Sequence, residues 1–163
     1  MSLEALRNTD LTVQISTKLN RSHLVHGKTA LILPCLGRTD EDSRGGEKQF
    51  LTVENSMGIV HTSTGKLKPV SKNLKSEPEI IAQLAIATLG ESEQYPWSHW
   101  ISHYDRIREL IEKSIPGFEN YNQRVRQPAG FYLPNGARNR NFKTSSGKAT
   151  FTCHTFEPIR IQP

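Results

Sequence analysis

Hydrophobic residues form two short runs early in the chain. Residues 11–15 (LTVQI) lead into Ser16, Thr17 and Lys18, and residues 30–33 (ALIL) end at Pro34. Strands joined by a connection of roughly a dozen residues pair in parallel more readily than as a tight hairpin. We therefore expect two adjacent parallel strands. Ligands of such sheets bind beyond the carboxyl ends of the strands, so residues 16–18 and 38–42 are the first places to search for a site.

Further β-like segments follow. Polar and apolar residues alternate at 49–56 (QFLTVENS), and a second segment at 58–63 precedes a loop marked by glycine and proline. Residues 147–153 (GKATFTC) also predict a strand. Residues 155–163 contain two prolines and no periodicity, which predicts a linker.

The middle of the chain follows helical spacing. Ser76 and Glu79 predict a capping box at the start of a helix that ends before Gly90. A second helix is expected to begin near Pro96 and to present an aromatic and aliphatic face, which indicates packing rather than ligand binding. Shorter helical pieces are predicted at 4–8, 20–26 and 118–126.

The composition limits the class of protein. Apolar residues make up 35% of the chain and the mean hydropathy is −0.55, so extensive polar surface or loops are expected. Cys35 and Cys153 are far apart and form no CxxC pair, which is typical of a reducing compartment. No apolar run approaches the roughly 18 residues of a membrane helix. The expectation is a soluble, cytoplasmic protein without a membrane segment.

The net charge is +5, from 21 basic and 16 acidic residues, and several of the bases gather between Arg124 and Lys148. Such a stretch can contact phosphate. A stand-alone basic nucleic-acid-binding module is therefore an alternative to be tested, although a solvated surface is the more ordinary interpretation.

Three groups of residues invite a catalytic interpretation. His99 and His103 are spaced i, i+4 like some metal-binding pairs, but they lack the HExxH glutamate, so a metal site is not expected. Cys35 follows the second strand and has only Arg38 nearby to lower its pKa, which favours packing over nucleophilic chemistry. The acids at 40–42 are expected to be a solvated loop. No catalytic residue is assigned.

Several segments together resemble a known family. TALILPCLGRTDED (29–42), QFLTVENSMGIVHTSTGKLKP (49–69) with LKSEPEIIAQLA (74–85), and TSSGKATF (144–151) resemble, in this order, segments of the large molybdopterin oxidoreductases. That group contains formate dehydrogenases and nitrate reductases. STKLNRSHLV (16–25) and NQRVRQPAGFYLPN (122–135) are most similar to its formate-dehydrogenase-like branch. The resemblance covers residues 6–153.

The resemblance implies a set of cofactor-binding residues. Ser16 and Thr17 match a polar pair near the guanine end of the cofactor, with Lys18 adjacent. Glu41 matches a position where relatives often carry Lys or His. Glu77 matches an acid, usually Asp, at the start of the first long helix, and a carboxylate there can accept two hydrogen bonds from a guanine edge.

The fold class implied is α/β: a partial Rossmann-like three-layer unit with a few short, mostly parallel strands and two to three helices, plus an irregular C-terminal segment. Residues 1–92 are expected to form part of the dinucleotide-binding α/β domain, 93–145 a helical and loop extension, and 146–163 a strand and linker toward a C-terminal barrel.

The implied function is that of an internal fragment of a molybdopterin-guanine-dinucleotide-dependent oxidoreductase. The parent would carry the cofactor with Mo or W and, in many relatives, an iron–sulfur cluster that this segment does not bind. Its partners would be the remainder of the parent chain, a small-molecule substrate and an electron carrier. The fragment itself is expected to be inactive and, because surfaces that met missing segments are exposed, to self-associate.

Overall fold

The computed structural model describes residues 2–156. Its elements in chain order are α1 (Ser2–Arg7), β1 (Leu11–Ser16), a 3-10 turn (Arg21–Leu24), β2 (Thr29–Pro34), β3 (Ser43–Arg44), β4 (Glu47–Lys48), β5 (Leu51–Glu54), β6 (Ile59–Ser63), α2 (Glu77–Leu89), α3 (Trp97–Ser102), α4 (Tyr104–Ser114), α5 (Tyr121–Val125) and β7 (Phe131–Tyr132). The chain is a partial mixed α/β unit with short strands and small sheets, as the sequence predicts.

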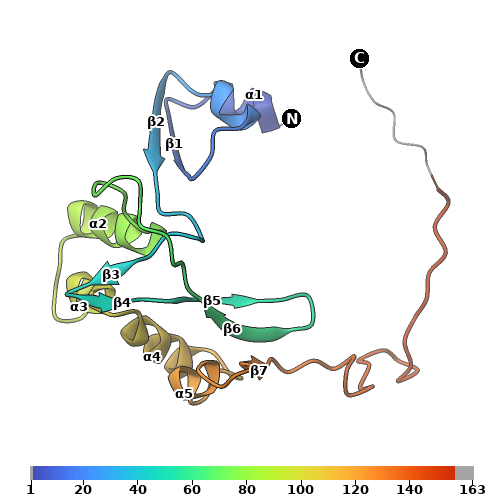
Figure 1. Ribbon diagram of the computed structural model, residues 1–163. Coiled ribbons are helices and arrows are strands. Elements are labelled where there is room, and N and C mark those ends of the chain that lie inside the picture. The colour runs from blue at the N-terminus through green and yellow to red at the C-terminus, as the bar shows by residue number, and fades with distance from the viewer. Residues whose placement is uncertain (1, 157–163) are drawn as a thin grey trace.

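The first two strands pair in parallel, with Leu11 opposite Thr29 and Ser16 opposite Pro34. This pairing confirms the prediction made from the two hydrophobic runs. Figure 1 shows α1, β1 and β2 standing away from the rest of the molecule. Val13 and Leu31 remain about half exposed in this strand pair, at 49% and 48%.

The prediction of mostly parallel strands is wrong beyond this pair. β3 and β4 form an antiparallel hairpin, and β5, β6 and β7 form an antiparallel sheet in that order. The connections between β3 and β4 and between β5 and β6 are short, which allows hairpins but no crossover. β7 joins β6 only after the helices α2–α5, so its antiparallel pairing is set by how these helices return the chain to the sheet. Gly45 and Gly46 both have positive φ values, 56° and 87°, as a two-residue hairpin turn requires.

The core lies where the three-stranded sheet meets α5. Val60, Tyr121, Val125 and Phe131 are its buried members. The ring of Tyr121 meets that of Phe131 edge-on at a centroid distance of 5.6 Å. Aromatic pairs in this geometry stabilise a core beyond the area that they bury.

The expected second helix is two helices. His103 adopts an extended backbone (φ −153°, ψ 123°) between α3 and α4, and its Nδ1 accepts a hydrogen bond from the backbone N–H of Asp105, 3.2 Å away. His103 therefore caps α4 at its N-terminus. The helical piece predicted at 4–8 is present as α1, which begins two residues earlier, and those predicted at 20–26 and 118–126 are present in shortened form.

The strand predicted at 147–153 is absent from the structure, where these residues form a turn and extended chain. Figure 1 shows the chain leaving the body after β7 as an extended arm. Phe151 is 93% exposed. With no neighbouring strand to pair its backbone groups, a β-prone segment has no reason to form a ladder. The end of the linker predicted at 155–163 lies outside the described residues.

Candidate functional site

A cavity of about 410 Å³ lies at the carboxyl end of the parallel strand pair. We call it the strand-end cavity. Thr17, just after β1, lines it together with Glu77, the first residue of α2. Phe50, Leu51 and Val53 contribute apolar wall. The charged residues Arg38, Asp40 and Asp42 also line it, so apolar surface and several polar groups meet in this cavity.

The loop at residues 35–42 forms the rear wall of this cavity and is held from both sides. The backbone N–H of Leu36 donates to the carbonyl of Lys75 at 2.9 Å, and that of Gly37 donates to Oδ2 of Asp40 at 2.7 Å. Gly65 crosses directly over Asp40, where a Cβ would overlap the Asp40 carbonyl. Only glycine fits this approach, so the wall of the cavity depends on it.

The structure brings two of the predicted cofactor residues together. Thr17 and Glu77 are both exposed and both line the strand-end cavity. Within residues 2–156, Glu77 has no hydrogen bond or ion pair from its side chain. Its carboxylate is therefore available to a ligand.

The other predicted residues lie elsewhere. Ser16 donates its hydroxyl to the carbonyl of Lys18 at 2.7 Å, and neither residue lines the strand-end cavity. Glu41 binds Lys48 at 2.9 Å, and this hydrogen bond holds the pKa of the Glu41 carboxyl below its usual value. Glu41 lines a different cavity from Glu77.

A buried polar network, which was not predicted from the sequence, forms part of the wall of the strand-end cavity. The Tyr104 hydroxyl bonds to Ser76 Oγ at 2.6 Å and to the Asp42 carboxylate. Burial, reinforced by the bond to Asp42, raises the pKa of Tyr104 to about 12. Gln49, itself buried, accepts from the Tyr104 backbone N–H at 3.0 Å. The helical pattern predicts only an aromatic and aliphatic packing face for this part of the chain and gives no sign of these partners.

Arg44 and Glu79 extend this network. Arg44 donates to Glu79 Oε2 at 2.6 Å and lies 3.5 Å from Asp42 Oδ1. Lys75 binds the other oxygen of Glu79 at 2.6 Å. Burial alone would raise the pKa of Glu79, but the hydrogen bonds from Arg44 and Lys75 outweigh it and leave the pKa lowered. The network ties β3 to the first turn of α2.

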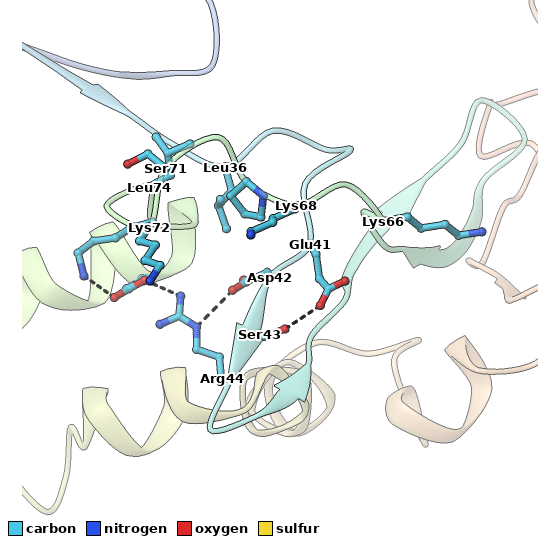
Figure 2. A pocket seen from close by; sticks show the side chains of 13 residues that line it. Leu36, Glu41, Asp42, Ser43, Arg44, Lys66, Lys68, Ser71, Lys72 and Leu74 are labelled. Carbon is cyan, nitrogen blue, oxygen red and sulfur yellow. Dashed lines mark hydrogen bonds and ion pairs between the residues drawn. The ribbon is translucent and has the colours of Figure 1, made fainter.

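A second cavity, of about 700 Å³, lies on the other side of the loop at residues 35–42. We call it the lysine cavity, because Lys66, Lys68, Lys72 and Lys75 all line it. Figure 2 shows Lys68 and Lys72 directed into the space beside Arg44 and Asp42, whereas Lys66 points away from it. The repeated lysines of residues 66–75 are the signal in the sequence that could have indicated this cavity.

The other residues that were considered as catalytic candidates do not form a site. Cys35 is buried, and burial together with the charge of Glu77 raises the pKa of its thiol, as expected for a packing residue. His99 and His103 do not share a helix, because the chain is extended at His103. Among residues 2–156, no three metal-ligating side chains cluster.

Three of the six bases between Arg124 and Lys148 make contacts within the chain. Arg124 lies 4.0 Å from the ring centroid of Phe131, and Arg138 lies 3.7 Å from that of Tyr132. Arg126 binds Asp105 at 2.7 Å. These guanidinium groups do not form the free stripe that nucleic-acid binding requires, so the structure gives the alternative of a nucleic-acid module little support.

None of the helices in residues 2–156 has the length and apolar character needed to cross a bilayer. No family model matches the chain, and no solved structure matches it either.

The sequence is similar to segments of much larger proteins. It is 52% identical over 160 residues to proteins named uncharacterized oxidoreductase in Mycobacterium tuberculosis and Mycobacterium bovis; the match covers 98% of this chain and 20% of each relative. It is 47% identical over 146 residues to protein YdeP of Escherichia coli, covering 90% of this chain and 19% of that protein. The chain therefore spans about a fifth of the length of the relatives that it matches.

Proposed function

We propose that this chain is part of a larger oxidoreductase of the formate-dehydrogenase-like molybdopterin group, in which it helps to hold the guanine end of a molybdopterin guanine dinucleotide. The observation that carries the proposal is the meeting of Thr17 and Glu77 in one cavity at the carboxyl end of two parallel strands. The printed names of the mycobacterial relatives support an oxidoreductase parent.

The residues of the strand-end cavity suit a guanine base. The Glu77 carboxylate, which has no partner within residues 2–156, can accept from the two adjacent N–H donors of the guanine edge. Phe50 and Leu51 offer apolar surface to the face of the base, and Thr17 adds a hydroxyl. Adenine presents a different donor and acceptor pattern, so Glu77 would favour guanine.

In the parent protein the bound cofactor would supply the redox chemistry of Mo or W. The residues described above would contribute binding and orientation only. Ser16, Lys18 and Glu41, which the resemblance also implies, would act at the margin of the site, since they do not line the strand-end cavity. The substrate, the electron carrier and any iron–sulfur cluster would be handled by other parts of the parent.

The test is a titration of the 163-residue chain with guanosine, followed by NMR chemical shifts, with adenosine as the competitor base. Guanosine is expected to bind with a dissociation constant of roughly 1 mM, about −4 kcal/mol, because only one part of the cradle is present. Glu77→Gln should weaken guanosine about tenfold and leave adenosine unchanged, since one charge-assisted pair is lost.

Glu93→Gln is the matched control, because Glu93 is also exposed but lies away from the cavity. Equal affinity for guanosine and adenosine, or an equal loss in both variants, would contradict the proposal. The chain alone should show no turnover in a dye-linked redox assay, and any turnover would refute the assignment of a purely binding role.

A further inference from the structure

Residues 66–75 form an arch with fixed ends. At one end the backbone N–H of Leu67 donates to Thr39 O at 2.9 Å, and that of Glu41 donates to Leu67 O at 2.8 Å. At the other end Leu36 donates to Lys75 O at 2.9 Å. The arch is therefore anchored at both ends across the lysine cavity.

The charges around the lysine cavity are unevenly paired. On its floor, Arg44 and Lys75 both bind Glu79, each at 2.6 Å. On the arch, Lys68 and Lys72 form no ion pair within the part of the chain that the structure describes. Glu41 and Asp42 also line the cavity, so its lining carries five bases against three carboxylates. An anion between Lys68 and Lys72 would reduce this excess of positive charge.

The geometry favours a small anion with several oxygens. Lys68 and Lys72 approach the same space from different points of the arch, with Ser71 lining the cavity between them in sequence (Figure 2). Lysine ammonium groups bind phosphate oxygens well. A volume of about 700 Å³ lies within the range of small-ligand sites, and the cations line a hollow rather than a surface stripe.

We propose that the lysine cavity is a binding site for a diphosphate group, held by Lys68 and Lys72. The proposal does not rest on the assignment of guanine to the strand-end cavity. The two cavities have only Leu36 and Asp42 in common among their lining residues. Either site can therefore fail without the other.

The experiment is isothermal titration calorimetry of the 163-residue chain with sodium pyrophosphate at constant ionic strength. Saturable binding is expected, and Lys68→Gln combined with Lys72→Gln should weaken it about tenfold, because two partly exposed charge pairs are lost. Far-UV circular dichroism of each variant shows that the fold is retained.

The control combines Lys143→Gln with Lys148→Gln, which removes the same net charge. Both lysines are exposed on the C-terminal arm and line neither cavity. The control variant should bind pyrophosphate within about twofold of the unsubstituted chain, since screened distant charges contribute little. The absence of saturable binding, or an equal loss in both double variants, would overturn the proposal.

GDP and ADP distinguish the source of the diphosphate. Equal affinity for pyrophosphate, ADP and GDP would identify a site for free or generic diphosphate. Tighter binding of GDP that is lost in Glu77→Gln would identify the diphosphate as part of a guanine nucleotide spanning both cavities. Both results support the site, and both differ from the guanosine titration, which contains no phosphate.

Discussion

The parallel strand pair β1–β2 differs from the body of the chain, by which we mean the antiparallel sheet β5–β6–β7 with α4 and α5. The two regions use hydrophobic residues in different ways. In β1 and β2, Val13 and Leu31 are half exposed although the backbone ladder is complete. In the body, Val60 and Val125 are 3% and 1% exposed. A parallel sheet needs cover on both faces. In the described part of the chain every residue of β2 is exposed, whereas α5 packs on the body sheet. A hydrophobic run creates a core only where another element packs on it.

The body also uses buried charge in a way that the strand pair does not. Arg108 is 4% exposed, binds the Asp105 carboxylate and donates to Phe50 O at 3.0 Å. Its guanidinium lies 4.0 Å from the ring centroid of Phe50. By contrast, the ion pair next to the strand pair, Lys28 with Asp10, has side chains that are 81% and 86% exposed. Such exposed pairs contribute little to stability.

The largest expected effect tests the core. Phe131→Ala should lower the free energy of unfolding by about 3–4 kcal/mol, because it leaves a cavity beside Tyr121 and Val125. Leu31→Ala in the strand pair should cost less than about 1 kcal/mol, because the side chain is already half in water. Urea unfolding followed by tryptophan fluorescence measures both, and equal losses would remove the distinction between the two regions.

The next effect concerns Gly65, which packs against the loop at residues 35–42 that leads from β2 to the body of the chain. Gly65→Ala should destabilise the chain by about 2–3 kcal/mol, since a Cβ would overlap the Asp40 backbone. Gly147→Ala is the control, because Gly147 has a φ of 65° but open space around it. Its cost should be only about 1 kcal/mol of backbone strain. Thermal melting compares the two, and a similar loss at both positions would show that the contact with Asp40 is not needed.

A smaller effect is expected from pH. Burial opposes ionisation of Asp105, but hydrogen bonds from Arg108 and Arg126 outweigh it and lower the pKa of that carboxyl from 3.8. A carboxyl with a lowered pKa in the folded chain stabilises it above the unfolded value and loses that contribution as the pH falls. Stability should therefore decline below about pH 4, as Asp105 and Glu79 take up protons in the unfolded chain first.

Asp105→Asn should flatten this decline and cost about 1–2 kcal/mol at pH 7, because charge-assisted bonds are lost. Asp10→Asn should leave the profile unchanged, since Asp10 is 86% exposed. Urea midpoints between pH 3 and 7 provide the measurement. An unchanged profile in Asp105→Asn would exclude this carboxyl as the source.

The smallest effect on stability is expected for Leu31→Thr, within about 0.5 kcal/mol. The same change should reduce self-association, because it breaks the exposed apolar surface of β2. Sedimentation velocity over a range of concentrations tests this. A loss of more than about 1 kcal/mol would mean that β2 is more deeply covered in solution than its exposure of 48% at Leu31 indicates.

Local sequence signals were accurate where the partner lay nearby in the chain. Ser76 was predicted to cap α2, and its Oγ accepts from the backbone N–H of Glu79 at 3.3 Å. The second hydrogen bond of the predicted capping box, from the Ser76 backbone N–H to the Glu79 side chain, does not form. The Glu79 side chain binds Arg44 and Lys75 instead. A cap is decided within one helical turn, whereas the choice of partner for Glu79 depends on a residue 35 positions away.

Predictions from the sequence were wrong or incomplete where an element depends on a partner far away in the chain. Residues 147–153 have the composition of a strand but no neighbour to pair with. β3 and β4 were missed although Gly45 and Gly46 mark their turn, because two-residue strands leave almost no alternation to detect.

The sequence by itself determined the two parallel strands, the start of α2 and the position of Thr17 at a strand end, because each depends on spacing and local propensity. Only the tertiary structure brought Glu77 to Thr17, separated Glu41 from both, and joined Tyr104 to Asp42 across 62 positions of the chain. The physical reason is that a binding cavity is made by side chains from different elements, and their meeting depends on how the elements pack. The lysines of residues 66–75 depend on both the sequence and the tertiary structure. The sequence places them close together, and the fold decides which of them face the cavity.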